Sequence, residues 1–467
     1  MEQKDLSLYL HIPFCAKKCA YCDFLSVPAD KITYDLYIQS LLGEIDAYRG
    51  SALSQRKVKT IFIGGGTPSI LPAEAIAKLL QKIKSVVHIS DKDWGTIEIS
   101  MEMNPGTVTY EKCLQYRDGG INRISIGLQS ACDEELKLLG RIHDYQTFLD
   151  TFQSVRKAGF ENVNVDLMAA LPGQTIHSYT ESLQKVIALS PEHISAYSLI
   201  IEEGTPFFER YREGGEAFGE LPDEETERRM YRITQEMLAG AGYGRYEISN
   251  YARKGRECLH NEVYWRRGDY LGLGLGASSL IDHIRYKNEE NLAQYLSYWK
   301  ERQQEKLQDT SRRKNSERSC HSHIVPIYDE YYQAELCKLT AEDEMAEFMF
   351  LGLRMMEGVS PQEFFACFGK DLMDVYGNQI EKHLSLGLLA WKDDETEVCH
   401  TDAYHTDAQS ANTRQVDERQ VDIQHTDSRQ INARQSYRKE NGYQQEGRLC
   451  LTPDGIDVSN AIFVDFL

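Results

Sequence analysis

The first two hundred residues alternate between short strand-like and longer helix-like segments, and this alternation constrains the fold most strongly. The strand-like runs are rich in β-branched and aromatic residues, and between them apolar residues recur with helical spacing, most clearly over 31–48. Six such alternations predict an α/β fold with a parallel sheet covered by helices, either a barrel or a doubly wound sheet. The predicted strands are 6–12, 58–64, 96–102, 123–129, 162–168 and 193–199, and the other predicted helices are 73–87, 132–139, 145–158 and 176–189.

Three cysteines, Cys15, Cys19 and Cys22, follow the first strand-like run with the spacing C-x3-C-x2-C. Ligands of α/β folds bind at the carboxyl ends of the strands, and three thiolates this close in sequence can converge on one metal centre. A structural zinc site takes four ligands, and a [4Fe–4S] cluster normally takes four cysteines. Three cysteines leave one iron open to another ligand, so the spacing favours a [4Fe–4S] cluster over structural zinc or inert thiols.

A glycine-rich turn, Gly64-Gly65-Gly66-Thr67-Pro68, ends the second strand-like run. Glycines let the backbone turn sharply and approach a ligand closely. The turn lacks the lysine of a phosphate-binding P-loop, and alone it would be a weak motif. Beside the cysteines at the neighbouring strand end, it becomes informative of a ligand site.

Composition excludes several classes of function. The chain has 467 residues, with 72 acidic and 52 basic side chains and a formal net charge of −20. This balance argues against a general phosphate-backbone binder, so we expect no nucleic-acid partner. The chain shows no apolar run of ~18 residues and no signal peptide, and its eleven cysteines are scattered. We therefore expect a cytoplasmic protein with reduced thiols and at most peripheral membrane association.

The remainder of the chain predicts further domains after a core over 1–220. Residues 221–300 contain an acidic-capped helix, a glycine turn and a strand, and residues 301–330 have few large apolar side chains, which predicts a flexible polar loop. Residues 331–467 show a helix, a turn, a second helix and a strand pair, the pattern of a winged-helix-like domain. This domain carries no basic recognition helix.

Residues 400–446 interrupt the C-terminal region with a degenerate five-residue repeat, in which His-Thr-Asp recurs at His400, His405 and His425. The repeat has too few large aliphatic residues for a core, so we interpret it as a disordered insertion between two strands. Its histidines could bind a metal, although a soluble repeat expansion is the preferred interpretation. The tract Cys320-His321-Ser322-His323 resembles a metal site, but its position in a polar loop favours coincidence.

Several motifs together resemble the oxygen-independent coproporphyrinogen oxidase family of the radical S-adenosylmethionine (SAM) superfamily. These are YLHIPFC, GGGTPS, EMNPG at 102–106, GLQS, LGRIH, NVDLMAALPGQT and HNEVYW, which occur in that order over nearly the whole chain except the two polar insertions. The resemblance implies a radical SAM (β/α) barrel, partial with six parallel strands, followed by a smaller α+β winged-helix-like domain. It also implies a [4Fe–4S] cluster on Cys15, Cys19 and Cys22 whose open iron binds SAM, which is cleaved to a 5′-deoxyadenosyl radical.

Carried over motif by motif, the resemblance implies further contacts. Tyr9 and Gly65 would contact the methionine part of SAM, and Glu102 would lie near its sugar or amine. For Arg141 and Asp166 the alternative is a structural ion pair across strand ends. The positions that match the second nucleotide of the oxidase branch are Gly66, Thr67, Gln129, Arg141 and Asp166.

One position departs from the oxidase pattern. The oxidase branch has a fourth cysteine two residues after the third, where this chain has Phe24. The difference favours the haem-chaperone branch of the family and argues against use of a second nucleotide. His260 begins the HNxxYW motif of that branch, and its imidazole could ligate haem iron. The alternative for His260 is a packed histidine that donates to a backbone carbonyl, with Tyr264 and Trp265 in the core.

The resemblance therefore implies a haem chaperone that binds haem, a [4Fe–4S] cluster and SAM, and that delivers haem to client haem proteins of the respiratory chain. A homodimer is expected. The alternative is an oxygen-independent coproporphyrinogen III oxidase, which would form protoporphyrinogen IX by oxidative decarboxylation. A radical enzyme that modifies RNA fits the cysteines, but it fits neither the net charge of −20 nor the HNxxYW motif.

Overall fold

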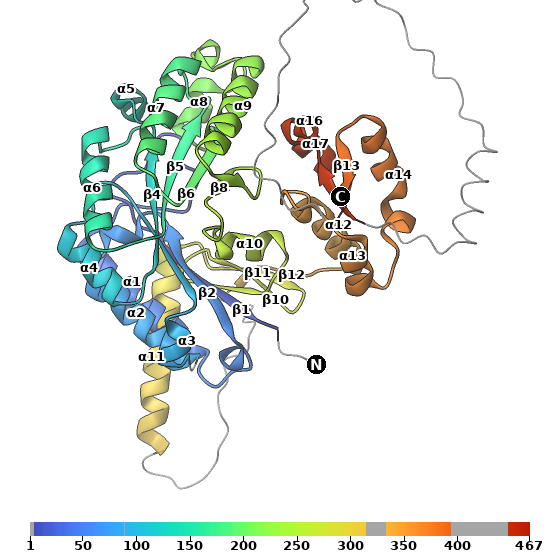
Figure 1. The fold of residues 1–467 in the computed structure, drawn as a ribbon. Coiled ribbons are helices and arrows are strands. Elements are labelled where there is room, and N and C mark those ends of the chain that lie inside the picture. Colours follow the sequence, from blue (N-terminus) through green and yellow to red (C-terminus); the bar gives the residue numbers. More distant parts are fainter. Residues whose placement is uncertain (1–3, 88, 314–332, 394–446) are drawn as a thin grey trace, which may run out of the picture. The chain divides into compact units, whose positions relative to one another are not determined.

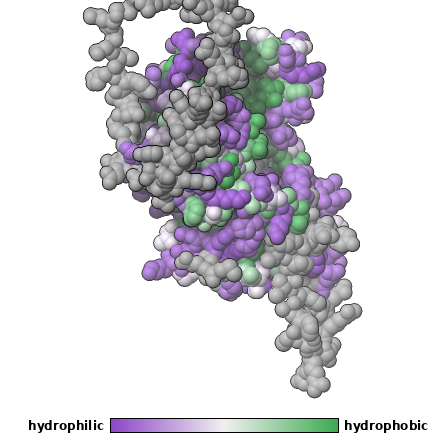
Figure 2. Space-filling view, turned by 90° about the vertical axis from the view of Figure 1, so that its right-hand side faces the viewer, coloured by the Kyte–Doolittle hydropathy of each residue, from purple (hydrophilic) through white to green (hydrophobic). Residues whose placement is uncertain are grey.

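A computed structural model describes residues 4–87, 89–313, 333–393 and 447–467. The chain divides into two compact units, Met1–Met356 with Leu467 and Glu357–Phe466 (Figure 1). Hydrophilic residues cover much of the face drawn in Figure 2, in keeping with the charged fraction of 27%. The helices of the described residues include none that is long and apolar enough to cross a membrane.

The first unit is built on one twelve-stranded sheet, in the order β12-β11-β10-β9-β1-β2-β3-β4-β5-β6-β8-β7. Its six central strands are parallel from neighbour to neighbour, which confirms the predicted parallel sheet. The order has two edges, so the sheet does not close into a full barrel. The six strands are β1 (Leu6–Ile12), β2 (Val58–Gly65), β3 (Glu98–Met103), β4 (Arg123–Gln129), β5 (Val163–Ala169) and β6 (His193–Ser198).

The strands alternate in chemistry along their length, as side chains on opposite faces of a sheet require. In β1, Leu6, Leu8 and Leu10 belong to the apolar core, whereas Ser7 lies on the other face and accepts a hydrogen bond from Thr60 of β2 at 2.9 Å. The second face of the sheet is therefore buried and polar. Polar side chains of this face, such as Ser125 and Asp166, also lie near the carboxyl ends of the strands.

Helices between the strands pack on the apolar face (Figure 1). Their starts are fixed by side-chain caps, such as Asp30 before the first helix, which accepts a hydrogen bond from the backbone N–H of Thr33. The predicted helices agree with the observed ones to within two residues at each end, but α3 and α4 were not predicted. The helices are α1 (Lys31–Ala47), α2 (Ala73–Val86), α3 (Asp91–Trp94), α4 (Tyr110–Asp118), α5 (Asp133–Leu138), α6 (Tyr145–Lys157) and α7 (Ile176–Ala188).

The rest of the first unit extends the sheet on both sides. Strand β9 (Tyr270–Leu273) pairs with β1 in parallel, and β8 (Asn250–Ala252) pairs with β6 in antiparallel fashion. The other elements are α8 (Pro206–Tyr211), α9 (Glu224–Gly240), β7 (Gly244–Arg245), α10 (Leu259–Trp265), β10 (Ser278–Ile281), β11 (Ile284–Asn288), α11 (Leu292–Arg313), β12 (Gln333–Lys338) and α12 (Ala341–Gly352).

The predicted flexible loop over 301–330 was wrong at its start, because residues 301–313 continue helix α11. Hydrogen bonds one turn apart support this extension, from Arg302 Nε to the Tyr298 hydroxyl at 3.2 Å and from Ser297 to Glu301 at 3.2 Å. A polar segment can extend a helix without an apolar face, because side-chain hydrogen bonds between residues four apart and the preceding helical turns stabilise it. The tract Cys320–His323 lies outside the described residues.

In the described residues of the second unit, two helices are followed by an antiparallel strand pair and two short helices, the element order expected of a winged-helix-like domain. The predicted boundary at 331 differs from the observed one, because β12 and α12 belong to the first unit and the second begins at Glu357. These are α13 (Pro361–Phe368), α14 (Leu372–Ser385), β13 (Leu389–Lys392), β14 (Arg448–Leu451), α16 (Pro453–Asp457) and α17 (Ser459–Val464). The repeat at 400–446, with its three histidines, lies outside the described residues.

Candidate metal and nucleotide site

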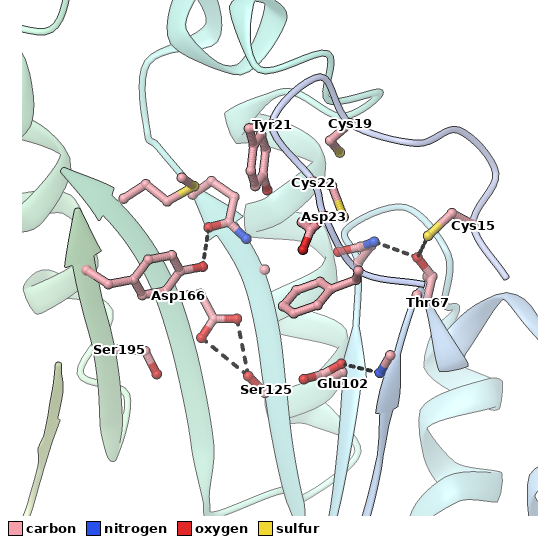
Figure 3. Close-up of a pocket in the computed structure, with 18 of the residues that line it drawn as sticks. Cys15, Cys19, Tyr21, Cys22, Asp23, Thr67, Glu102, Ser125, Asp166 and Ser195 are labelled. Carbon is pink, nitrogen blue, oxygen red and sulfur yellow. Dashed lines mark hydrogen bonds between the residues drawn. The ribbon is translucent and has the colours of Figure 1, made fainter. Parts of the chain in front are cut away.

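A cavity of about 510 Å³ opens at the carboxyl ends of the parallel strands (Figure 3). It brings together most of the predicted site residues from five different strand ends. Tyr9 and His260 are the two predicted residues that do not line it. Those that do are Cys15, Cys19, Cys22, Gly65, Gly66, Thr67, Glu102, Gln129, Arg141 and Asp166.

The three cysteines lie on the segment 13–30 between β1 and α1, and all three are free, half-buried thiols. The base of this loop is closed by a bridge between Phe14 and Val27. Its middle is tied down where the Ala20 N–H donates to the carbonyl of Leu139 at 3.0 Å. The thiols are therefore held against the cavity by backbone hydrogen bonds at both parts of the loop.

A chain of hydrogen bonds joins two of these thiols. The Thr67 hydroxyl lies 3.3 Å from Cys15 Sγ and accepts a hydrogen bond from Asn104 Nδ2 at 2.7 Å. Asn104 Oδ1 accepts from Arg141 Nη2 at 2.8 Å, and Arg141 Nη1 lies 3.7 Å from Cys19 Sγ. Thr67 and Arg141 thus place donors at two sulfurs, which stabilises thiolates as metal ligands. Asn104 was missed by the sequence analysis, although it lies within the EMNPG motif.

The donor set fits an iron–sulfur cluster better than a single ion. Over the described ranges, no three His, Cys, Asp or Glu side chains lie close enough together to hold one metal ion. A four-iron cluster is larger than one ion, so its thiolates stand further apart. Three free thiols around one cavity, two of them with donors at sulfur, are suited to that larger group.

The glycines of the second strand end permit close approach of the backbone. A Cβ at Gly66 would lie 2.7 Å from the carbonyl oxygen of Phe14 and 3.0 Å from Cys15 Sγ. Gly65 has φ = 114°, and its N–H donates to Glu102 Oε2 at 3.0 Å. Any side chain at these positions would displace the cysteine loop or close the cavity.

Glu102 and Asp166 are buried carboxyl groups on the cavity wall. Burial, and next the charge of nearby Asp166, raise the pKa of Glu102 to about 8. Burial also raises the pKa of Asp166, whose carboxylate accepts from Asn164 Nδ2 at 2.7 Å and from Ser125. At neutral pH the Glu102 carboxyl is therefore largely protonated and can both donate and accept hydrogen bonds.

Gln129 and Arg141 differ in the hydrogen-bond donors that they leave free for a ligand. Gln129 Oε1 accepts from the Tyr197 hydroxyl at 3.0 Å, and its Nε2 has no partner among the described residues. Arg141 already donates to Asn104 and, at 2.6 Å, to the carbonyl of Gly127. The alternative of an Arg141–Asp166 ion pair is not formed, since Arg141 binds these other partners.

Tyr9 lies one layer away from the cavity. Its hydroxyl donates to His11 Nδ1 at 2.9 Å, and His11 Nε2 donates to the carbonyl of Leu25 at 2.9 Å. Leu25 belongs to the cysteine loop, so Tyr9 positions this loop through His11. A direct contact with a bound nucleotide stays a prediction.

His260 lies in the core, on helix α10, with 1% of its surface exposed. Thr60 donates to Ser7, so its oxygen accepts from His260 Nδ1 at 2.7 Å. His260 Nε2 then accepts from the Tyr264 hydroxyl at 2.9 Å. Burial, and next the charge of Arg123, lower the pKa of His260 to about 3. These contacts leave neither ring nitrogen free for iron. His260 is thus packed as in the alternative, but its partner is a side-chain hydroxyl and not a backbone carbonyl, and Tyr264 and Trp265 are half-buried.

Asn261 and Arg123 are among the lining residues that were not predicted. Asn261, the second residue of the HNxxYW motif, reaches the cavity next to the buried His260. Arg123 also lines the cavity, is 2% exposed, and has an Nε atom without a hydrogen-bond partner among the described residues. The motif could have indicated Asn261, whereas Arg123 carried no signal beyond its place in a strand.

The comparisons with known proteins agree with this geometry. The Radical SAM superfamily matches residues 9–186, and the HemN C-terminal domain matches residues 339–398. The fold is similar to that of coproporphyrinogen III oxidase (HemN) from Escherichia coli, with a TM-score of 0.67 and 20% identity over 99% of this chain and 90% of that chain. At that identity the likeness shows the fold alone.

Curated relatives are more similar in sequence. Heme chaperone HemW of Lactococcus lactis is 36% identical over 389 residues, which are 83% of this chain and 92% of the relative. HemW of Bacillus subtilis is 32% identical over 394 residues, 84% of this chain and 95% of the relative. HemW of Escherichia coli is 42% identical over 278 residues, 59% of this chain and 70% of the relative. With its parallel partial barrel and its three cysteines at the strand ends, the chain belongs to the HemW family of the radical SAM superfamily.

Proposed function

We propose that this protein is a haem chaperone, which binds haem together with a [4Fe–4S] cluster and SAM and passes the haem to client haem proteins. The observation that carries the proposal is the cavity that joins three free thiols to the glycine turn and to Glu102. The similarity to the heme chaperones HemW of Lactococcus lactis and Bacillus subtilis supports the haem part.

In this proposal Cys15, Cys19 and Cys22 would hold the cluster, beside the part of the cavity that would take SAM. The bound cluster supplies an electron for reductive cleavage of SAM. The protein positions the cluster and SAM and excludes water from them. Gly65 and Gly66 let the ligand approach the backbone, and the neutral Glu102 carboxyl can bond to a ribose hydroxyl or an amine.

Of the positions that match a second nucleotide, two are proposed to contact a ligand. Gln129 offers a free amide donor and Asp166 a carboxylate, whereas Arg141 is already engaged with Asn104 and Gly127. Gly66 and Thr67 adjoin Cys15. We infer that this side of the cavity contacts a polar ligand group mainly through Gln129 and Asp166.

Phe24 distinguishes the chaperone from the oxidase. It lines the cavity at the position where the oxidase branch has a fourth cysteine. We therefore propose haem binding without conversion of coproporphyrinogen III. Clients in the respiratory chain and a homodimer complete the proposal, and these two points follow from the family resemblance alone. The proposed cytoplasmic location rests instead on the composition and the scattered cysteines.

The test uses anaerobically reconstituted full-length protein with two ligands in parallel. Titration with haemin should give saturable binding at one haem per chain, followed by the Soret band. Incubation with coproporphyrinogen III, SAM and a reductant should give no protoporphyrinogen IX by chromatography. Formation of protoporphyrinogen IX, or absence of saturable haemin binding, would overturn the proposed function.

A further inference from the structure

The cavity changes its chemistry between its interior and its opening. The interior is polar, with Glu102, Ser125, Asn164 and Asp166 among its lining residues. The opening carries two large apolar side chains, Phe24 and Ile200, which are 70% and 68% exposed. It also carries the exposed Lys17 and Lys18. The two regions suit different ligands, because an apolar ligand placed in the interior would leave buried polar groups without partners.

We propose that haem binds at this opening, with its macrocycle against Phe24 and Ile200 and its propionates towards Lys17 and Lys18. The inference rests on the proposed function, since it takes haem as the ligand and assigns its site. The site lies apart from the HNxxYW histidine, whose two ring nitrogens are bonded within the core.

The two apolar side chains come from opposite ends of the row of parallel strands. Phe24 lies on the cysteine loop after β1, the first strand of the row, and Ile200 lies just after β6, the last. Both nevertheless line the same cavity, so a flat ligand at its opening can contact both. Large exposed apolar side chains gathered at a cavity mark a binding surface, and their burial under a macrocycle is favourable.

The charges of the opening favour one orientation of the ligand. Lys17 and Lys18 are adjacent and form no ion pair with any residue that the structure describes. Asp23 and Glu202 also line the opening and repel propionates, so at the opening propionates are attracted towards the two lysines. In a chain with a net charge of −20, such a local cationic pair is needed to attract a dianionic ligand.

The apolar contact is tested with two substitutions and a matched control in the full-length reconstituted protein. Phe24→Ser combined with Ile200→Ser should weaken haemin binding by at least about tenfold, or ~1.4 kcal/mol. Ile32→Ser is the control, because Ile32 is 69% exposed on α1 and does not line the cavity. The control should bind haemin as the wild type does. Iron and sulfide content verifies that the cysteine loop is intact.

The charge contact is tested by comparing haemin with haemin dimethyl ester. Lys17→Glu combined with Lys18→Glu should weaken binding of haemin but leave binding of the ester unchanged, since the ester carries no propionate charge. Lys78→Glu on α2, an exposed lysine away from the cavity, should affect neither ligand.

The outcomes separate this inference from the proposed function. Wild-type affinity for haemin in both double variants would overturn the proposed haem site at the opening of the cavity, called the rim site below, while leaving haem binding itself in place. Absence of haemin binding in the wild type would overturn the proposed function instead. Substitutions in the cysteine loop could lower the cluster content and so affect haemin binding indirectly. In that case Ile200→Ser alone tests the rim site, because Ile200 follows β6 and lies outside the cysteine loop. That variant should weaken haemin binding by about fivefold, as expected for partial loss of one apolar contact, and unchanged affinity would contradict the rim site.

Discussion

His260 Nδ1 lies 2.7 Å from the hydroxyl oxygen of Thr60, and this contact fixes helix α10 against strand β2. Glu98 of the next strand strengthens the same junction by accepting the backbone N–H of His260 at 3.1 Å. His260 also stacks on Phe62, with ring centroids 5.1 Å apart. The histidine of the HNxxYW motif thus stabilises the floor of the barrel, and Asn261 beside it reaches the cavity.

His260→Ala should therefore act on stability. Loss of the buried ring and of its two hydrogen bonds should lower the free energy of unfolding by ~2–4 kcal/mol. The Soret band of bound haemin should not shift in the folded variant. Urea unfolding and haemin titration measure the two effects, and His177→Ala, at an exposed histidine of α7, is the control. A shifted haem spectrum with normal stability would show that His260 is a haem ligand.

The same variant should show a weaker dependence of stability on pH. Burial lowers the pKa of His260 to about 3, whereas a histidine in the unfolded chain has a pKa of ~6.5. Below about pH 6.5 the unfolded chain therefore binds a proton that the folded chain does not. Acidification to about pH 5 should lower the free energy of unfolding of the wild type by ~2 kcal/mol through this residue. Above about pH 7 this residue should no longer make the free energy of unfolding depend on pH. His193 and His143, whose pKa values are also lowered by burial, keep part of the slope in the variant.

Each of the three loop cysteines should be required for the cluster. Replacement of Cys15, Cys19 or Cys22 by alanine leaves two protein ligands, so iron and sulfide content after anaerobic reconstitution should fall to a small fraction of the wild-type value. Cys132→Ala is the matched control, because Cys132 is also a half-buried free thiol but does not line this cavity. Wild-type iron content in Cys19→Ala would refute the assignment.

Gly66→Ala should disturb the cysteine loop without altering any ligand. The added Cβ would lie 2.7 Å from the Phe14 carbonyl oxygen and 3.0 Å from Cys15 Sγ, and the backbone oxygen cannot move cheaply. We expect loss of most of the cluster together with a lower melting temperature. Gly219→Ala, where no atom lies within 4 Å of the added Cβ, should change neither quantity. A fully loaded Gly66→Ala protein would show that the close approach is not needed.

The repeat should be dispensable for the fold. Strands β13 and β14 pair with Lys392 opposite Arg448, so the chain ends on either side of 394–446 already lie together. Replacing these residues with a short turn such as Asn-Gly should preserve the second unit and favour it by up to ~2 kcal/mol through a lower loop-closure entropy. Calorimetry and iron content measure the result. Loss of the second unit's transition or of the cluster would show that the segment has a structural role.

The parts of the site that sequence patterns predicted are those fixed by neighbouring strands. Strands β1 and β2 pair in parallel with Ile12 opposite Gly65, so the cysteines after one strand and the glycines at the end of the other meet at one edge. Residues from β3, β4 and β5 join them for the same reason. Local spacing and the parallel topology are sufficient for this part.

The parts that could not be predicted depend on contacts distant in sequence. His260 finds Thr60 two hundred residues away, and no local pattern separates that packed state from a ligand at a cavity. Asn104 gains its role only from its bonds to Thr67 and Arg141. Helix α4 has only two buried residues, Cys113 and Tyr116, which is too short an apolar stripe to recognise.

Haem transfer tests the central claim most directly. The full-length protein, reconstituted with its cluster and loaded with one equivalent of haemin, is mixed with membrane vesicles from haem-depleted cells that contain apo-cytochromes of the respiratory chain. Apomyoglobin in a parallel reaction measures passive release of haem. If the protein is a haem chaperone, haem should appear in the membrane cytochromes faster than it is released to apomyoglobin. Transfer no faster than passive release, or formation of protoporphyrinogen IX from coproporphyrinogen III by the same preparation, would contradict the account.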